Sequence, residues 1–136
     1  MANYEATSRS NYFRVKDTEA FEAWAHSRGL ILLQGNKAED QTGIAPEEMS
    51  DGDWPSTVYD EAEDDFVEID FIDELAGHLA DGEVAVLMSA GHEKLRYVSG
   101  FATAITSEGE VARVSLTDIY DKLKEAGYTG VTPAEY

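Results

Sequence analysis

The chain has 136 residues and a formal net charge of −18 at pH 7, because its 28 acidic residues are balanced by only 10 Lys and Arg. It contains no Cys, which excludes disulfides, thiol catalysis and Cys-ligated zinc. An acidic protein of this kind repels nucleic acid and anionic membranes, since direct phosphate binding needs clustered Lys and Arg, so we expect a basic partner.

All of the net charge lies in residues 38–93, which we call the acidic segment. It holds 18 Asp and Glu and no Lys or Arg, whereas the rest of the chain has 10 acids and 10 bases. A hydrophobic content of 43% is still enough for a packed core, and the length predicts a single domain spanning residues 1–136. Residues 1–10 are polar and no apolar run approaches the roughly 18–20 residues of a membrane span, so we expect a soluble protein.

The first third of the sequence predicts a strand–helix–strand unit. Apolar and charged residues alternate within residues 10–17, which indicates a half-buried strand. Asp17 or Thr18 then caps a helix that ends just before Gly29, a residue suited to the position after a helix. The apolar run at residues 30–33 is typical of a short buried strand.

A long acidic loop is expected next, at about residues 35–60. Gly, Pro, Asn and Asp recur there without helical or strand periodicity. Long ordered loops are often functional, and the alternative is a solvated, mobile excursion. Trp54, Val58 and Tyr59 are the side chains that can anchor this loop to the body of the protein.

The second half of the sequence predicts a strand at residues 66–69, then a helix capped by Asp70. Strands at residues 83–89, 95–106 and 111–114, with turns between them, form an antiparallel meander. A last helix follows Ser115, and its buried face is expected to comprise Leu116, Ile119, Tyr120 and Leu123. The sum is an α+β fold, a mainly antiparallel sheet with about three helices packed on it.

No catalytic motif is recognisable in the sequence. There is no nucleophile elbow, no S-x-x-K motif and no Gly-rich phosphate loop, and the three His residues lack metal-ligand spacing. We therefore expect neither an enzyme nor a cofactor. The acids near residues 51–53 and 60–65 offer oxygen ligands without matching the EF-hand pattern, so an acidic divalent-metal-binding module remains an alternative.

The charge of the acidic segment is comparable to that of a short DNA duplex. At one charge per about 1.7 Å of axis, 18 charges correspond to about 9 base pairs or roughly 30 Å. A compact domain of this length has a radius of gyration of about 14 Å, so one face can present charge at a similar density. Two alternatives stay open: a solubilising face, or an immunity or antitoxin-like protein that covers a basic nuclease.

Segments Ser10–Asp17, Asp81–Val86 and Tyr97–Phe101 resemble small proteins carried by phages and mobile elements. In size and charge the chain is also similar to phage anti-CRISPR and plasmid antirestriction proteins, several of which are DNA mimics. This resemblance implies a non-enzymatic inhibitor, monomeric or homodimeric, that acts in the host bacterial cytosol. Its target would be a basic DNA-binding protein or complex of a defence system, with a CRISPR effector favoured.

The side chains expected to imitate phosphates are the acids of the central part of the acidic segment. Two aromatic side chains, Trp54 and Tyr59, are candidates for an anchor in the partner surface. The acidic residues of this predicted interface are Asp51, Asp53, Asp60, Glu61, Glu63, Asp64, Asp65, Glu68, Asp70, Asp73 and Glu74.

Overall fold

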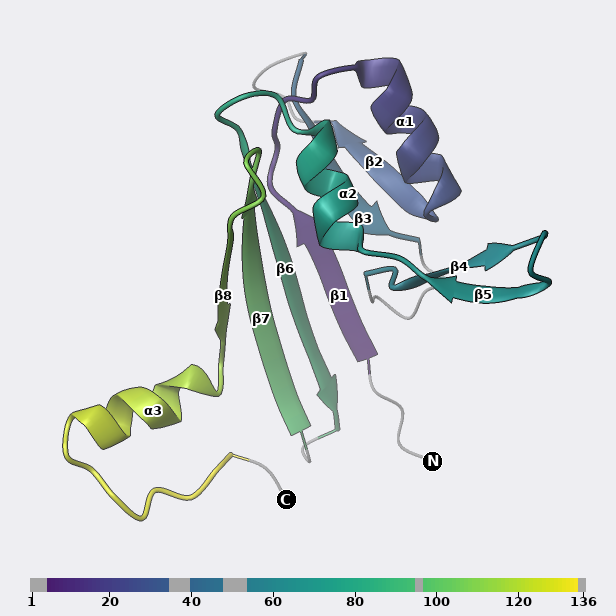
Figure 1. Ribbon diagram of the computed structural model, residues 1–136. Coiled ribbons are helices and arrows are strands. Elements are labelled where there is room, and N and C mark those ends of the chain that lie inside the picture. The colour runs from purple at the N-terminus through teal and green to yellow at the C-terminus, as the bar shows by residue number, and fades with distance from the viewer. Residues whose placement is uncertain (1–4, 35–39, 48–53, 95–96, 135–136) are drawn as a thin grey trace.

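The computed structural model describes residues 5–34, 40–47, 54–94 and 97–134 (Figure 1). Within these residues the fold is α+β, with three helices and eight strands in antiparallel sheets. The predicted fold class and the strand–helix–strand start are confirmed. No helix in the described part of the chain is long and apolar enough to cross a membrane.

The largest sheet has four strands in the order β1 (Glu5–Ser10), β6 (Val84–Glu93), β7 (Tyr97–Thr106) and β8 (Val111–Ser115). The predicted meander is confirmed as β6, β7 and β8, each antiparallel to the next. The first turn of the meander lies later than the predicted strand bounds place it, because Gly91 and His92 belong to β6.

The first strand lies earlier than the sequence predicts. Residues 11–17 form only isolated bridges, Phe13 with Thr42 and Val15 with Leu79, and β1 ends at Ser10. The sequence does not predict this strand because its side chains are mostly polar. Ser10 is nevertheless buried, and its hydroxyl accepts a hydrogen bond of 2.8 Å from the amide of Ile44.

The first helix and its caps follow the sequence closely. α1 (Thr18–Ser27) begins after Asp17, whose carboxylate accepts a hydrogen bond of 3.1 Å from the amide of Ala20. It ends before Gly29, which has a φ of 69°. The next strand, β2 (Leu30–Gln34), is only partly buried, since Ile31 is 44% exposed.

The long irregular loop expected at about 35–60 is wrong in two places. β3 (Thr42–Pro46) pairs with β2, and β4 (Thr57–Asp60) pairs with β5 (Asp65–Glu68). Gly43 is a turn signal in the sequence, yet here it lies within β3. The position requires Gly because a Cβ atom would come 2.9 Å from the carbonyl oxygen of Asn11.

One hydrophobic core joins α1, α2 (Phe71–His78) and one face of the large sheet. The rings of Phe13 and Phe21 meet edge to face at 5.8 Å, and Trp24 stacks on Phe71 at 5.4 Å. The sheet contributes buried side chains from its inner face, namely Ala85, Leu87, Thr103 and Ile105.

The opposite side, which we call the outer face of the sheet, carries Val84, Val86 and Met88 on β6. Alternation along the strand places these three on one face. Since neighbouring residues alternate, the buried partners are Ala85 and Leu87, and Met88 is 58% exposed.

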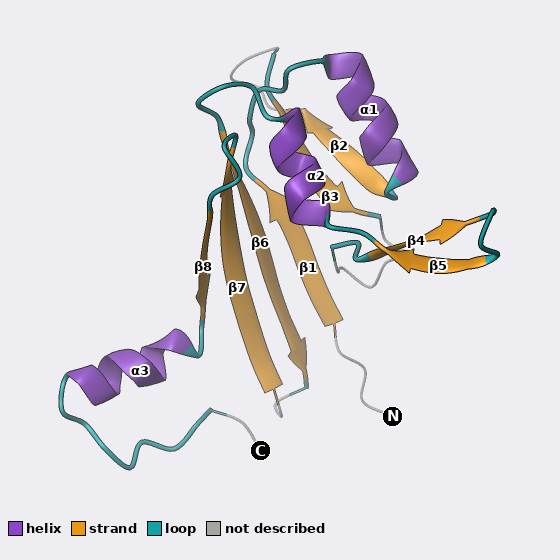
Figure 2. Ribbon diagram, viewed as in Figure 1, coloured by secondary structure: helices purple, strands orange, loops and turns teal. Residues whose placement is uncertain are grey.

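The last helix, α3 (Asp118–Glu125), contradicts the prediction of a buried apolar face. None of its residues is buried, and Figure 2 shows it apart from α1 and α2, beyond the end of β8. Its amphipathic pattern is present, and the chain after the helix returns to it, where the amide of Ala134 donates a hydrogen bond of 2.6 Å to the hydroxyl of Tyr120. The pattern of apolar residues predicts the stripe but not what packs against it.

Candidate functional site

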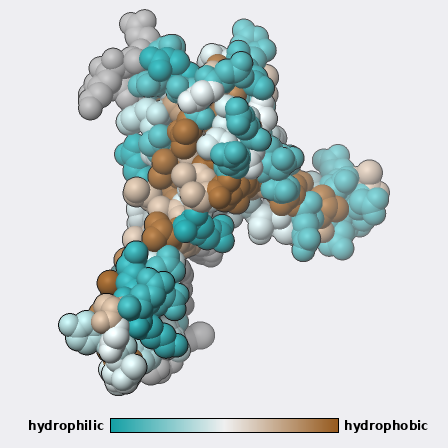
Figure 3. Space-filling model, turned by 60° about the vertical axis from the view of Figure 1, so that its left-hand side comes forward, coloured by the Kyte–Doolittle hydropathy of each residue, from teal (hydrophilic) through white to brown (hydrophobic). Residues whose placement is uncertain are grey.

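Strands β4 and β5 form a hairpin, residues 57–68, which we call the acidic arm. It pairs with neither of the other sheets and projects from the body of the protein (Figure 1). Figure 3 shows it as a mainly hydrophilic projection that carries a smaller hydrophobic area. Its 12 residues contain six acids and no Lys or Arg. The acids of the arm are Asp60, Glu61, Glu63, Asp64, Asp65 and Glu68.

Local bonds explain the turn of the arm. The carboxylate of Asp60 accepts a hydrogen bond of 2.9 Å from the amide of Ala62, as Asp does at many turns. Asp64 adopts a left-handed conformation with a φ of 50° and accepts a hydrogen bond from the hydroxyl of Tyr59. That bond raises the pKa of Tyr59, because it favours the neutral phenol.

Two aromatic rings lie across the arm from each other. Tyr59 pairs with Phe66 in the strand register, and their ring centroids are 5.5 Å apart. Tyr59 is 48% exposed and Phe66 is 67% exposed. An apolar pair left in solvent and surrounded by acids is suited to contact with another protein.

The sequence named Tyr59 as an anchor and missed Phe66. Both residues flank the acidic run at 60–65, one on each side. A hairpin centred on that run would have placed them opposite each other, which is the signal that could have identified Phe66.

The base of the arm is fixed to the helix α2. The amide of Ile69 donates to the carbonyl of Ser56 at 2.9 Å, and the ring of Trp54 stacks on Phe71 at 5.7 Å. Trp54 is therefore partly buried in the protein itself, unlike Tyr59. Its indole nitrogen is buried and has no hydrogen-bond partner within the described ranges.

Two predicted acids, Asp73 and Glu74, belong to α2 and a third, Asp70, is its N-cap; they differ in exposure. Asp70 caps the helix by accepting a bond of 3.0 Å from the amide of Asp73, and both are exposed. Glu74 points inward and accepts bonds from Arg28 at 2.8 and 3.1 Å and from the indole of Trp24 at 2.9 Å. The Arg28 bond, with that of Trp24, lowers the pKa of Glu74. Glu74 is thus used inside the fold.

Internal ion pairs divide the acidic segment into two kinds of acid. Arg14 pairs with Asp40 at 2.6 Å and with Glu83 at 4.0 Å, as Arg28 does with Glu74. None of the six arm carboxylates lies in an ion pair with a cation in the described ranges. The arm therefore gathers six carboxylates without an ion pair into 12 residues. Asp51 and Asp53, also predicted for this surface, lie outside the described residues.

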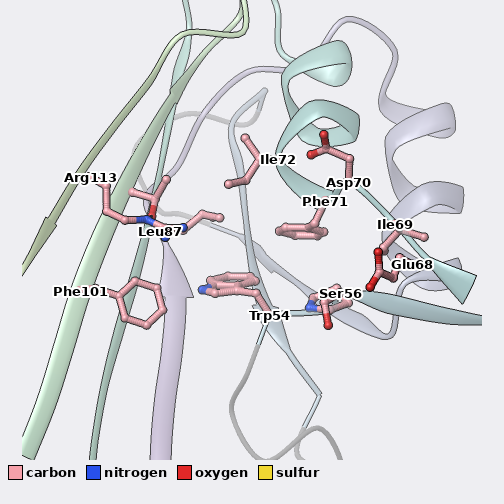
Figure 4. Close-up of a pocket in the computed structure, with 12 residues that line it drawn as sticks. Trp54, Ser56, Glu68, Ile69, Asp70, Phe71, Ile72, Leu87, Phe101 and Arg113 are labelled. Atoms are coloured by element: carbon pink, nitrogen blue, oxygen red, sulfur yellow. The ribbon is translucent and has the colours of Figure 1, made fainter.

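A cleft of about 810 Å³ lies between the base of the arm, α2 and the inner face of the sheet (Figure 4). Glu68 and Asp70 line its arm end, and Arg113 lines the sheet end, where its side chain donates to Thr103 at 3.2 Å. Among the residues described, no His lines the cleft, so it lacks the hydroxyl–imidazole pair of nucleophilic catalysis.

His78 is a structural residue rather than a ligand. Its ring lies 5.7 Å from Phe21 and 5.1 Å from Trp24, and burial lowers its pKa. Across the described ranges, no group of three or more His, Asp or Glu side chains converges as a metal site requires. Comparisons with known protein families, with curated proteins and with solved structures found no match.

Proposed function

We propose that the acidic arm binds the phosphate-binding surface of a basic nucleic-acid-handling protein in the bacterial cytosol, and that binding is the whole activity. The observation that carries the proposal is the arm itself: six uncompensated carboxylates on a projecting hairpin. A component of a defence system against foreign DNA is the favoured target, with a CRISPR effector first among these. A positively charged channel would attract the arm and lose access to its nucleic acid.

The charge density of the arm supports this proposal. Strands of four residues extend about 14 Å at about 3.4 Å per residue. Six charges on duplex DNA occupy roughly 10 Å of axis at about 1.7 Å per charge. The arm therefore presents acidic charge at a spacing close to that of phosphates, on a support narrow enough to enter a groove.

The exposed ring pair adds an apolar contact, which charge alone does not provide. Electrostatic attraction accelerates association and aligns the partners, whereas aromatic anchors contribute much of the affinity in protein interfaces. Tyr59 and Phe66 lie beside the acids on one hairpin. A partner that offers an apolar pocket within a basic channel would therefore be preferred over any other basic surface.

The test is capture from a bacterial lysate with the immobilised full-length chain and two triple variants. The arm variant carries Glu61→Gln, Glu63→Gln and Glu68→Gln, which remove three exposed charges. The matched control carries Glu22→Gln, Glu108→Gln and Glu125→Gln, which remove three exposed charges elsewhere. Captured proteins are identified at low and raised salt, with and without competing duplex DNA.

The proposal predicts that the wild-type chain and the control capture the same nucleic-acid-binding protein, which duplex DNA and salt displace. The arm variant should capture much less of it. If the captured protein is a nuclease that belongs to no defence system, the result supports the immunity-protein alternative. The arm would then bind a basic surface in the same way, with a different target. Equal capture by both variants would refute the role of the arm.

A further inference from the structure

The cleft beside the base of the acidic arm has the size and the mixed lining of a small-molecule site. Its volume is about 810 Å³, and ligand pockets commonly have about 300–1,000 Å³, with mainly apolar and aromatic walls and a few polar groups. Three aromatic side chains line it, and they come from different parts of the fold: Trp54 before β4, Phe71 in α2 and Phe101 in β7. The binding proposed for the arm does not use these side chains.

Arg113 places a positive charge at the sheet end of the cleft. Its Nε atom donates to the hydroxyl of Thr103 at 3.2 Å, and Thr103 is only 2% exposed, so the guanidinium is held by a buried group. Its central carbon lies 5.8 Å from the ring centroid of Phe101. No Asp or Glu in the described ranges forms an ion pair with Arg113. The terminal nitrogens of this guanidinium are therefore suited to donate together to a carboxylate.

Trp54 contributes a second donor to the wall of the cleft. Among the residues described, nothing accepts a hydrogen bond from its buried indole nitrogen. Figure 4 shows this nitrogen on the side of Trp54 that faces Phe101 and the sheet. Because buried donors in proteins are nearly always paired, this one is suited to an acceptor oxygen that a ligand brings between Trp54 and the sheet.

The arm end of the cleft has the opposite charge. Glu68 and Asp70 line it, and both are exposed. Between the two ends the aromatic rings, Leu87 and Ile72 provide an apolar lining. A single negative group at the sheet end of a ligand fits this pattern, whereas a second one at the arm end would face two carboxylates. The lining therefore selects an apolar molecule with one negative charge.

We propose that this cleft binds a flat, apolar small molecule that carries one carboxylate. The carboxylate accepts hydrogen bonds from Arg113, and the flat body lies between Trp54 and Phe101, where aromatic rings favour stacked or edge contacts. Phe101 is 41% exposed in the single chain, so a ligand can cover part of its ring. The proposal does not depend on the function of the acidic arm.

The experiment is an NMR titration of the full-length chain, followed through its indole N–H signals. The probes share one ring system: naphthoate, uncharged naphthol, and a naphthalene dicarboxylate with its two groups at opposite ends. The chain has two Trp residues, so two indole signals are expected. The signal of Trp24 is the internal reference, because that indole already donates to Glu74 at 2.9 Å. Trp54→Phe assigns the other signal.

Two variants test the part played by the guanidinium. Arg113→Gln removes the positive charge at an exposed position, so the fold should survive. Arg9→Gln is the matched control, because Arg9 also lies over an aromatic ring, that of Tyr12 at 5.4 Å. Arg9 lines a separate groove on the outer face of the sheet. Circular dichroism verifies the fold of each variant.

We expect naphthoate to shift the signal of Trp54 and to leave that of Trp24 in place. Its affinity should be about tenfold higher than that of naphthol or of the dicarboxylate. Arg113→Gln should remove this preference, and Arg9→Gln should retain it. A Trp54 signal that naphthoate does not shift at millimolar concentration would overturn the proposal. Equal affinities for naphthoate and naphthol, or undiminished binding of naphthoate to folded Arg113→Gln, would overturn it as well.

Discussion

The acidic arm and α3 both project from the body, but they expose opposite kinds of surface. The arm carries six acids in 12 residues, whereas the 43 residues from 94 to 136 have a net charge of −1. The arm shows one aromatic pair among charges, and α3 shows an apolar stripe continuous in sequence with a bare sheet face. The difference teaches that charge and apolar area are separated along this chain, so each surface selects a different kind of partner.

The largest expected effect on the arm is the loss of an aromatic ring. Phe66→Ala should weaken partner binding by about 30-fold, roughly 2 kcal/mol, which is typical of an aromatic anchor. Stability should hardly change, because Phe66 is 67% exposed. Titration of the captured partner measures this affinity, with Ile31→Ala as the control. An unchanged affinity would mean that charge alone accounts for binding.

Stability should separate Glu74 from the acids of the arm. Glu74→Gln breaks the pair with Arg28 and weakens the bond from Trp24, so we expect a loss of about 1–2 kcal/mol in unfolding free energy. Glu63→Gln on the arm should change it by less than about 0.5 kcal/mol. Chemical denaturation compares the two variants. Equal losses would show that Glu74 is as free as the arm carboxylates.

The same pair predicts a pH dependence. The pKa of Glu74 is lowered in the folded state, so its contribution is present above the unfolded pKa and is lost as the pH falls through the folded-state value. The pKa of His78 is lowered as well, so stability should begin to fall below the unfolded imidazole value of about 6.5. The difference in unfolding free energy between wild type and Glu74→Gln should therefore be largest at neutral pH and should shrink toward zero at acid pH. A difference constant with pH would contradict this assignment.

The smallest expected effect is at Gly100, where Leu116 touches the outer sheet face. An added Cβ would lie 3.1 Å from a methyl carbon of Leu116, an exposed side chain that can move. Gly100→Ala should therefore change stability by less than about 1 kcal/mol, as measured by thermal unfolding. A much larger loss would show that Leu116 is held rigidly by the sheet.

The sequence predicts the two buried helices well because their signals are local. Asp17 and Asp70 cap them, and their apolar residues recur at helical spacing. β1 and β3 escape prediction because a polar strand with buried Ser10, and a strand containing Gly43, are recognisable only from residues far away in the chain. Local sequence patterns do not predict such long-range contacts.

The acids of the candidate site follow from composition alone, but their roles do not. The internal use of Glu74 depends on Arg28, which lies 46 residues earlier and approaches only through packing of α1 against α2. The hairpin that displays Asp60 to Glu68 falls partly within the expected loop. Its pairing of Tyr59 with Phe66 was available in the sequence as two aromatic residues flanking one acidic run.

One measurement tests the role of the acidic arm most directly: a salt series in which partner capture is compared between the wild-type chain and the triple variant Glu61→Gln, Glu63→Gln, Glu68→Gln. Screening weakens the attraction between the acidic arm and a basic partner. We predict that rising salt releases the partner from the wild-type chain, and that the arm variant captures much less of it even at low salt. Capture by the wild-type chain that does not change with salt, or equal capture by the arm variant at low salt, would contradict this prediction.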